Sequence, residues 1–556
     1  MKNNDWWKSS VVYQIYPKSF KDSNGDGVGD LVGIIEKLDY LKDLGVKVIW
    51  LTPIYVSPQN DNGYDIADYY NIDPMFGSVE DFKKLLEETH KRYMKLILDM
   101  VVNHTSTEHH WFKEAIKDIN SPYHDFYIWR EEPNNWRSKF GGSAWEYVES
   151  LDEYYLHLFD KTQADLNWEN PKLREEIFKM MRYWLDMGVD GFRLDVINLL
   201  SKDTRFLDDD FKSATRDGRR FYTDGPKIHQ YLNLLNKEVF SKYSGIMTVG
   251  EMSSTTIDNC IKYTNTENEE LDMTFNFHHL KVDYPKGEKW ELAPFDFHIL
   301  KKLLFEWQIE MEKGNGWNAL FWCNHDQPRI VSRFGNDSVY REGSAKMLAT
   351  AIHLMRGTPY VYQGEEIGMT NPNFNDINDY RDVESLNAYN TLLEKGIEKE
   401  EILNILKNRS RDNSRTPMQW NNMKEAGFTS GTPWIKLSSN YNKINVELER
   451  NKSNSILNYY MELIKIRKNN KIVSEGKFIP LLEEHSKILA YIRELNGREI
   501  LVACNFYGEK TMASLKDIKG MDFDTLLSNS DENKLQEENI FLEPYGAIVL
   551  ELRMKE

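Results

Sequence analysis

Residues 95–104 read KLILDMVVNH, a short apolar run that contains Asp99 and ends in Asn103 and His104. The run is too short for a typical helix, so it predicts a buried strand over 95–102. Seven further stretches share this form, and most are followed by a helical pattern: 11–16, 46–51, 189–195, 246–251, 271–277, 319–326 and 360–365. Strands that alternate with helices pair in parallel, so eight such units predict an α/β protein built on a closed (β/α)₈ TIM barrel. A doubly wound open sheet is the alternative.

The spacing of these runs divides the chain into domains. We expect the barrel to occupy 1–104 and 173–478. The stretch after the third strand is rich in Trp, Tyr and turn-forming residues, which predicts an inserted loop-rich domain over 105–172. A second insertion is expected at about 370–430, after the eighth strand. Over 479–556 alternating strands follow one another without helices, which predicts a C-terminal antiparallel β-sandwich domain.

The composition is typical of a soluble globular protein. Of 556 residues, 40% are hydrophobic, and the formal net charge is −18, which argues against nucleic acid or an anionic membrane as a partner. The three cysteines, Cys260, Cys323 and Cys504, are far apart and odd in number, as expected in a reducing compartment. Because the sequence has no signal-peptide pattern or membrane span, we expect a cytoplasmic protein.

The stretch KDSNGDGVGD, residues 21–30, places oxygen-bearing side chains at Asp22, Asn24, Asp26 and Asp30. This spacing resembles the start of an EF-hand loop, in which oxygen ligands surround a calcium ion. An EF-hand requires Glu at its twelfth position, where Gly33 stands. The flanking patterns are a strand before the loop and a helix after it. The loop therefore predicts either a metal site in a βα connection or a Gly- and Asp-rich turn without an ion.

Polar groups are concentrated at the ends of the predicted strands. The third strand ends in DMVVNH, the fourth in GFRLDV, the fifth in VGEM and the seventh in WCNHDQPR. Since parallel barrel strands end at one rim, these side chains should converge there: Asp99, His104, Arg193, Asp195, Glu251, His325 and Asp326. A single acid at a strand end is more often a helix N-cap, but three carboxylates on separate strands indicate catalysis. The two histidines lie in no metal-spaced cluster, which disfavours zinc.

These motifs resemble the α-amylase family of retaining glycoside hydrolases, in its oligo-1,6-glucosidase-like branch. VYQIYPKSF, DNGYDI, DMVVNH, QADLNWEN, GFRLDV, GEM, NHDQPR and RDNSRTPMQW occur in the family's order along the whole chain. The resemblance implies that Asp195 is the nucleophile, held ionised by Arg193, and that Glu251 is the general acid and base. It implies that Asp326 binds sugar hydroxyls and helps to distort the ring. No organic cofactor is expected.

The same resemblance implies a pocket for one glucose unit. His104 and His325 would hydrogen-bond hydroxyls of the reacting sugar, and Tyr64 would stack on its ring. Asp61, paired with Arg411, would close the far end of the pocket, so the enzyme would be exo-acting. Arg415 competes with Arg411 as the partner of Asp61, and the sequence does not separate the two.

The resemblance also assigns a role to the loop at 21–30. It implies a structural calcium or magnesium ion held by Asp22, Asn24, Asp26 and Asp30 together with the backbone carbonyl of Val28. The ion would lie away from the chemistry and stabilise the fold by binding only the folded chain.

Several stretches, above all ELDMTFNFHHLKVDYPKGEKW at 270–290, resemble trehalose-6-phosphate hydrolases. A phosphorylated disaccharide is therefore the expected substrate, cleaved to glucose and glucose 6-phosphate. Lys281 and Lys289 are the predicted phosphate ligands, because positive charge gathers near the barrel rim of an acidic chain. Lys286 sits in a Pro-Lys-Gly turn that suggests exposure. The alternative for these lysines is an ordinary solvated loop.

Other functions fit the sequence less well. An oligo-1,6-glucosidase acting on isomaltose-type sugars is the alternative enzyme. A barrel used as an interaction module, as in the heavy-chain partners of amino-acid transporters, would need a membrane span and usually lacks the catalytic acids. A transglycosylating isomerase such as a trehalose synthase keeps the three carboxylates, so only product analysis would exclude it.

Overall fold

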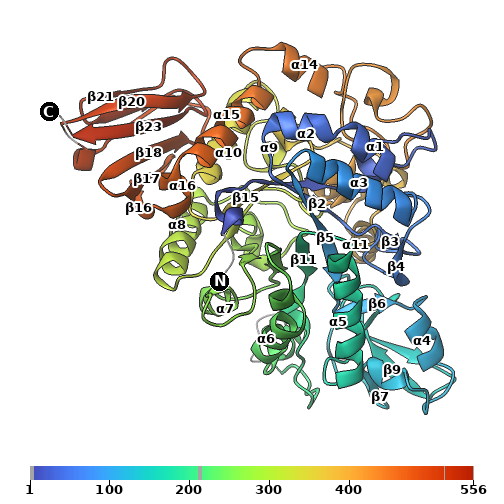
Figure 1. Cartoon of the computed structure of the whole chain (residues 1–556). Coiled ribbons are helices and arrows are strands. Elements are labelled where there is room, and N and C mark those ends of the chain that lie inside the picture. The colour runs from blue at the N-terminus through green and yellow to red at the C-terminus, as the bar shows by residue number, and fades with distance from the viewer. Residues whose placement is uncertain (1–4, 211–215, 519, 555–556) are drawn as a thin grey trace.

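The centre of the computed structural model, which describes residues 5–210, 216–518 and 520–554, is an eight-stranded parallel sheet (Figure 1). Its order is β13-β12-β11-β5-β2-β1-β15-β14. A parallel bridge from Thr274 in β13 to Asn318, beside β14, joins the two ends of the sheet. The predicted TIM barrel is thus confirmed. Its strands are β1 (Val12–Ile15), β2 (Val48–Leu51), β5 (Lys95–Val101), β11 (Gly191–Asp195), β12 (Met247–Glu251), β13 (Met273–Phe275), β14 (Ala319–Leu320) and β15 (Thr358–Tyr362).

All eight barrel strands differ from the sequence prediction in at least one bound, and the seventh and eighth illustrate the difference. The eighth, β15, begins at Thr358 rather than at 360. The seventh, β14, holds only Ala319 and Leu320 in the sheet, although the prediction extended to 326. Beyond Leu320 the chain leaves the ladder, and the polar residues at 324–326 stand above the rim instead of pairing with neighbours.

Helices surround the barrel and bury their apolar faces against it. In α3, for example, Ser78 and Asp81 form a reciprocal capping box, and Phe82, Leu85 and Leu86 are buried. The other barrel and linking helices are α1 (Leu31–Glu36), α2 (Leu38–Leu44), α3 itself (Val79–Lys91), α5 (Pro171–Asp186), α6 (Ile228–Glu238), α7 (Ile257–Thr264), α8 (Phe297–Lys313), α9 (Ile330–Arg333), α10 (Arg341–His353), α14 (Val446–Asn451), α15 (Ile456–Asn469) and α16 (Lys471–Glu475).

An inserted domain leaves the barrel after β5 and returns with α5. A three-stranded antiparallel sheet, β7-β9-β8, and the pair β10-β6 form its frame. The buried Lys202 ties this domain to the barrel, because its ammonium lies 2.8 Å from both Asp165 in β10 and Asn103 beside β5. The elements are β6 (His104–Ser106), α4 (His110–Ala115), β7 (Trp129–Arg130), β8 (Trp145–Val148), β9 (Glu153–Leu156) and β10 (Gln163–Asp165). A short hairpin, β3 (Tyr55–Val56) and β4 (Asp68–Ile72), precedes α3.

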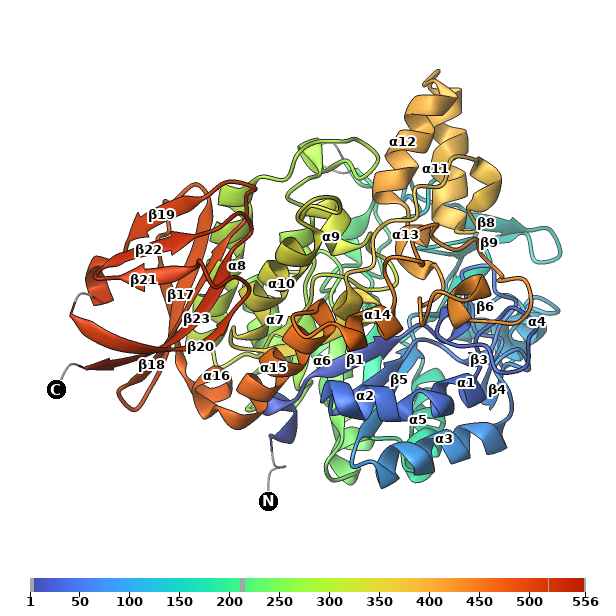
Figure 2. The same cartoon turned by 90° about the horizontal axis from the view of Figure 1, so that it is seen from above.

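A second insertion follows β15 and carries α11 (Val383–Glu394), α12 (Lys399–Arg409) and α13 (Asp412–Arg415). Figure 2 shows α11 and α12 side by side as a projection from the barrel. Asn387 in α11 donates to the carbonyl of Phe140 in the inserted domain at 3.3 Å, so the two insertions meet above the barrel rim.

The C-terminal domain consists of two antiparallel sheets at the end of the molecule opposite the inserted domain (Figures 1 and 2). Ile488, Leu501, Ile540 and Leu550 come from both sheets and share one core, as in a sandwich. One sheet has the order β16 (Lys477–Leu481), β17 (Ile488–Leu495), β18 (Arg498–Asn505), β23 (Ala547–Met554) and β20 (Met521–Ser528). The other has β19 (Thr511–Ser514), β22 (Asn539–Leu542) and β21 (Lys534–Gln536).

Candidate active site

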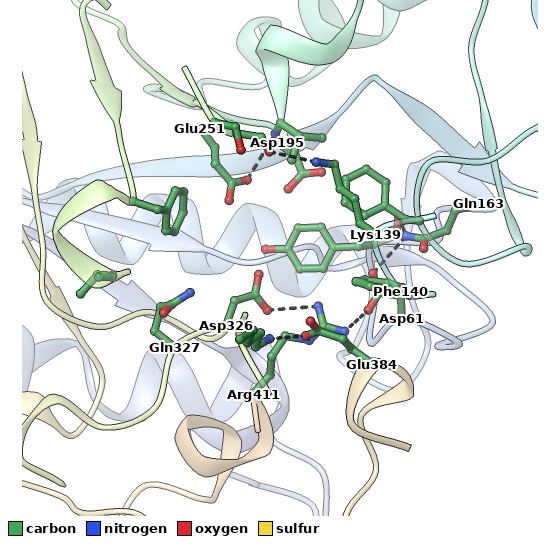
Figure 3. Close-up of a pocket in the computed structure, with 18 of the residues that line it drawn as sticks. Asp61, Lys139, Phe140, Gln163, Asp195, Glu251, Asp326, Gln327, Glu384 and Arg411 are labelled. Carbon is green, nitrogen blue, oxygen red and sulfur yellow. Dashed lines mark hydrogen bonds and ion pairs between the residues drawn. The ribbon is translucent and has the colours of Figure 1, made fainter. Parts of the chain in front are cut away.

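A cavity of about 260 Å³ opens above the carboxyl ends of the barrel strands. Barrel loops line it together with both insertions: Lys139, Phe140 and Gln163 come from the inserted domain, and Glu384 and Arg411 from the second insertion. Figure 3 shows Glu251 and Asp195 on one side of the cavity and Asp326, Gln327 and Arg411 on the other.

One buried guanidinium brings the two predicted reacting carboxyls together. Asp195 is the last residue of β11, and Glu251 is the last residue of the neighbouring β12. Arg193 donates from Nη1 to Asp195 at 2.6 Å and to Asp99 at 2.7 Å, and from Nη2 to Glu251. The guanidinium itself lies behind the cavity wall over the ring of Trp50. Arg193 therefore orients both carboxyls from below.

The backbone at both ends of β11 is shaped for this contact. Gly191 has a φ of +140°, and a Cβ there would come within 1.8 Å of the carbonyl of Met247, so only glycine lets β11 and β12 start this close together. Val196, directly after Asp195, has a φ of +36°, which is strained for a β-branched residue. This turn points the Val196 N–H toward Glu251, 3.3 Å away.

The surroundings give Glu251 and Asp195 different pKa values. Burial raises the pKa of Glu251 to about 8, with Arg193 opposing the shift and Asp195 and Asp326 adding to it. Burial raises the pKa of Asp195 only to about 6, against the pull of Arg193. At neutral pH Glu251 therefore holds a proton while Asp195 is mostly ionised.

Asp326 stands across the cavity in a strongly cationic setting. Arg415 donates to it at 2.6 Å, Arg411 lies 3.4 Å away, and His325 Nε2 lies 3.3 Å from its second oxygen. Burial acts to raise its pKa, but His325, Arg411 and Arg415 hold that pKa well below its usual range. Asp326 is thus a permanent carboxylate.

The two histidines are neutral hydrogen-bonding groups. Burial lowers the pKa of His104 to about 4 and that of His325 to about 3. Gln14 lies 2.8 Å from Nδ1 of His325, and a donated amide hydrogen there leaves the ring proton on Nε2, facing Asp326. His104 Nε2 lies 3.1 Å from the carbonyl of Tyr64 and lines the cavity, whereas His325 lies behind its wall.

The far end of the cavity is closed by paired charges. Arg411 donates to Asp61 at 2.8 Å and also to Asp382, and Gln163 donates to the other oxygen of Asp61 at 3.1 Å. Arg415 instead donates hydrogen bonds to Asp326 and to the backbone carbonyl of His325. The structure therefore places Arg411, and not Arg415, against Asp61.

Tyr64 forms one wall of this closed end. Its ring stacks on His325 with centroids 5.0 Å apart and planes within 4°, and its hydroxyl donates to Asp99 at 2.9 Å. Held on one side by these contacts, Tyr64 lines the cavity with the rest of its surface.

Three lysines line the cavity, and they are in two different situations. Lys289 lies 2.5 Å from Glu384, which also lies 3.4 Å from Arg411, so Lys289 belongs to the network of paired charges. Lys281 and Lys139 also line the cavity, but neither has a carboxylate within ion-pair distance among the residues that the structure describes. Lys281 is exposed, yet protein atoms crowd it enough to lower its pKa, with Arg219 contributing. Lys286 is exposed in a turn of the same loop and lies outside the lining.

The sequence matches known families over almost its whole length. Residues 14–476 match the α-amylase catalytic domain, and residues 478–549 match the maltogenic amylase C-terminal domain. The chain belongs to the α-amylase family. It is accordingly a glycoside hydrolase.

Among curated relatives of this α-amylase family member, the trehalose-6-phosphate hydrolase of Bacillus subtilis is 58% identical, and the alignment covers 98% of each chain. The oligo-1,6-glucosidase of Bacillus cereus is 50% identical over 99% of each chain. A crystal structure of trehalose-6-phosphate hydrolase from Bacillus licheniformis superimposes with a TM-score of 0.96 at 59% identity, covering 99% of this chain and 100% of that one.

The loop at 21–30 is closed by its own hydrogen bonds. Asp22 accepts from the N–H groups of Asn24 and Gly25 at 2.9 and 2.7 Å, and from Gly27 and Thr429 through its other oxygen. Asp30 caps α1. No group of three acidic, histidine or cysteine side chains within the described ranges is placed to hold a metal ion. The oxygen-only donor set suits a hard cation, but the predicted metal site stays a prediction.

Sequence reasoning missed several residues of the cavity. Lys139, Phe140 and Gln163 reach the cavity from the inserted domain, and Glu384 reaches it from α11. None stands at a barrel strand end, so the strand pattern could not find them. Gln163 is the first residue of the family motif QADLNWEN, and this motif is the sequence signal that could have identified it as a cavity residue.

No helix in the part of the chain that the structure describes combines the length and apolar character needed to cross a membrane.

Proposed function

We propose that this chain is a retaining, exo-acting α-glucosidase that hydrolyses trehalose 6-phosphate to glucose and glucose 6-phosphate. The observation that carries the proposal is the contrast between the two ends of the cavity. The closed end pairs its carboxylates with Arg411 and Arg415, as suits an uncharged glucose unit, whereas the Lys281 ammonium has no acidic partner among the described residues. An anionic group on the outer sugar would fill that place.

The chemistry follows from the two carboxyls at the ends of β11 and β12. The ionised Asp195 attacks the anomeric carbon while Glu251 gives its proton to the departing glycosidic oxygen. Glu251 then removes a proton from water, which attacks the same carbon and releases Asp195. Two inversions at one carbon retain its configuration. The neutral state of Glu251 and the ionised state of Asp195 at pH 7 support these roles.

The closed end supports exo action. Asp61 and Arg411 block the cavity behind the glucose that reacts, and Tyr64 lines its side. A longer chain could not extend past this ion pair. The phosphate therefore belongs on the leaving unit, which points toward the mouth.

An oligo-1,6-glucosidase is the second candidate, because a relative of that name is 50% identical over almost the entire chain. Isomaltose carries no charge, however, and would leave Lys281 without a partner. A phosphorylated substrate accounts for that lysine, and the 58% identical relative is named for one.

Hydrolysis rates on trehalose 6-phosphate, trehalose, isomaltose and sucrose, measured side by side, test the proposal. We expect trehalose 6-phosphate to be cleaved fastest, with glucose and glucose 6-phosphate as equimolar products and α-glucose as the anomer first seen by NMR. Faster cleavage of isomaltose would favour the oligo-1,6-glucosidase, rearranged disaccharides would indicate an isomerase, and β-glucose as the first anomer would exclude retention.

We also propose that the loop at 21–30 binds a calcium or magnesium ion through Asp22, Asn24, Asp26, Asp30 and the Val28 carbonyl. The ion would have to draw the carboxylates inward from their present hydrogen bonds. Its contribution would be to stability, since it would tie the loop before α1 to the segment of Thr429. The three cysteines are free and buried, which supports a reducing, cytoplasmic location.

A further inference from the structure

We infer that Lys139 of the inserted domain is the second phosphate ligand of this enzyme and that it acts together with Lys281 of the barrel. The substrate's phosphate is then held between two domains, and Lys139 determines the preference for a phosphorylated leaving unit. This inference rests on the function proposed above and names a residue that strand-end patterns do not reveal.

The backbone around Lys139 is firmly anchored, so its side chain has a defined direction. The Lys139 N–H donates to the carbonyl of Leu158 at 2.9 Å, and the hydroxyl of the preceding Ser138 donates to the carbonyl of Phe159 at 2.6 Å. The side chain then runs into the cavity, where its ammonium donates to the hydroxyl of Ser253 at 3.2 Å (Figure 3). Lys139 thus extends from the inserted domain to the loop that follows β12 of the barrel.

The charge of Lys139 is not neutralised within the described residues. Glu251 and Asp217 act on it only from beyond ion-pair distance, and Asp217 is already paired with Arg219 at 2.6 Å. Burial, followed by the nearby cations Arg219 and Lys281, lowers the pKa of Lys139 to about 8. Two cations that face one cavity repel each other, and an anion between them would relieve that repulsion.

Lys289 provides an internal contrast. It lines the same cavity, but its ammonium lies 2.5 Å from Glu384. Lys289 is therefore already paired with a carboxylate and is less suited to bind an anionic ligand. Of the three lysines that line the cavity, Lys139 and Lys281 are therefore the pair suited to a phosphate dianion, each as a point charge with several N–H donors.

The position of Lys139 matches the leaving unit and not the reacting glucose. Ser253, which it contacts, follows Glu251 by two residues. Because Glu251 protonates the departing oxygen, the leaving unit lies on the Glu251 side of the scissile bond. Asp61 and Arg411, which hold the reacting glucose in the proposed mode, belong to the closed end.

The test compares Lys139→Gln with Lys139→Arg on two substrates. For Lys139→Gln we expect kcat/KM for trehalose 6-phosphate to fall about ten- to hundredfold, whereas the value for 4-nitrophenyl α-glucoside changes less than about threefold. Lys139→Arg should recover much of the loss because it restores the charge. Inhibition by glucose 6-phosphate should weaken in Lys139→Gln, with inhibition by glucose unchanged.

Lys286→Ala is the matched control, since it removes a lysine from the loop of Lys281 outside the cavity lining. Equal losses on both substrates for Lys139→Gln, or unaltered inhibition by glucose 6-phosphate, would overturn the inference. If the unmutated enzyme prefers trehalose 6-phosphate and Lys139→Gln keeps that preference, only the role of Lys139 fails. If the unmutated enzyme shows no such preference, the proposed function itself fails.

Discussion

The two ends of the cavity are built on opposite electrostatic principles. At the closed end Asp61, Asp326 and Asp382 share Arg411 and Arg415 in a buried network. At the mouth, two ammonium groups lie within the same cavity without carboxylate partners among the residues described. A network of paired charges can orient neutral hydroxyls and keeps its geometry without a ligand. An ammonium group without a carboxylate partner can instead form an ion pair with an anionic group of the ligand. The contrast implies that variants at the closed end affect all substrates alike and variants at the mouth discriminate between them.

The largest effect is expected between these ends, at the reacting carboxyls. Asp195→Asn should reduce turnover at least about a thousandfold on every substrate, because an amide cannot form the glycosyl intermediate. Glu251→Gln should be as severe for trehalose 6-phosphate, whose leaving oxygen needs a proton, and milder for 4-nitrophenyl α-glucoside, whose leaving group does not. Steady-state rates on both substrates measure this difference.

Circular dichroism melting curves provide the control for these two variants, which should stay folded. Substantial hydrolysis by purified Asp195→Asn would remove Asp195 as nucleophile. An identical loss on both substrates for Glu251→Gln would argue against its role as acid.

The next largest effect tests the closed end. Asp61→Ala removes an acceptor for sugar hydroxyls and one partner of Arg411. We expect kcat/KM to drop about a hundredfold for trehalose 6-phosphate, trehalose and 4-nitrophenyl α-glucoside alike, since all three place the same glucose there. A loss confined to the phosphorylated substrate would contradict the assignment of this end to the uncharged sugar.

At the mouth the effect should be selective. Lys281→Ala removes a charge-assisted contact to phosphate worth about 1.5–3 kcal/mol, so kcat/KM for trehalose 6-phosphate should fall about ten- to hundredfold. Trehalose and 4-nitrophenyl α-glucoside lack the phosphate and should be nearly unaffected. Lys286→Ala serves as the matched control, and an equal loss on all three substrates would show that Lys281 only supports the rim.

The pH profile sharpens the comparison at the reacting centre. Asp195 must be ionised and Glu251 protonated, so kcat/KM should fall below about pH 6 and above about pH 8. The alkaline limit arises because Glu251 loses its proton as the pH rises through its raised pKa. Profiles measured on 4-nitrophenyl α-glucoside avoid the titration of the substrate phosphate. A profile flat up to pH 9.5 would rule out Glu251 as the titrating acid.

The smallest effect concerns the loop at 21–30, which tests stability apart from specificity. Removing divalent metal should lower the melting temperature by a few degrees, because only the folded loop assembles the ligands. Asp22→Ala with Asp26→Ala should reproduce the shift, and the ratio of rates on trehalose 6-phosphate and trehalose should not move. An unchanged melting curve after rigorous chelation would leave the loop as a turn closed by hydrogen bonds.

The sequence by itself determined the barrel and the convergence of the candidate catalytic carboxyls at its rim. Short apolar runs such as 95–102 predict buried strands, and parallel strands must end at one rim. The strand pattern alone therefore places Asp195, Glu251 and Asp326 near one another. This reasoning works because it needs only local periodicity and the chain order of the barrel.

Only the tertiary structure decided which partners these groups have. Arg411 and Arg415 are four residues apart, about one helical turn, and both contact Asp326 and Asp382, yet only Arg411 forms an ion pair with Asp61 among the described residues. Lys289 was predicted as a phosphate ligand, and its pairing with Glu384 depends on how α11 folds back over the rim. Lys139 enters from a separate domain. Such contacts join segments far apart in the chain, and no local pattern encodes the path of the insertions that bring them together.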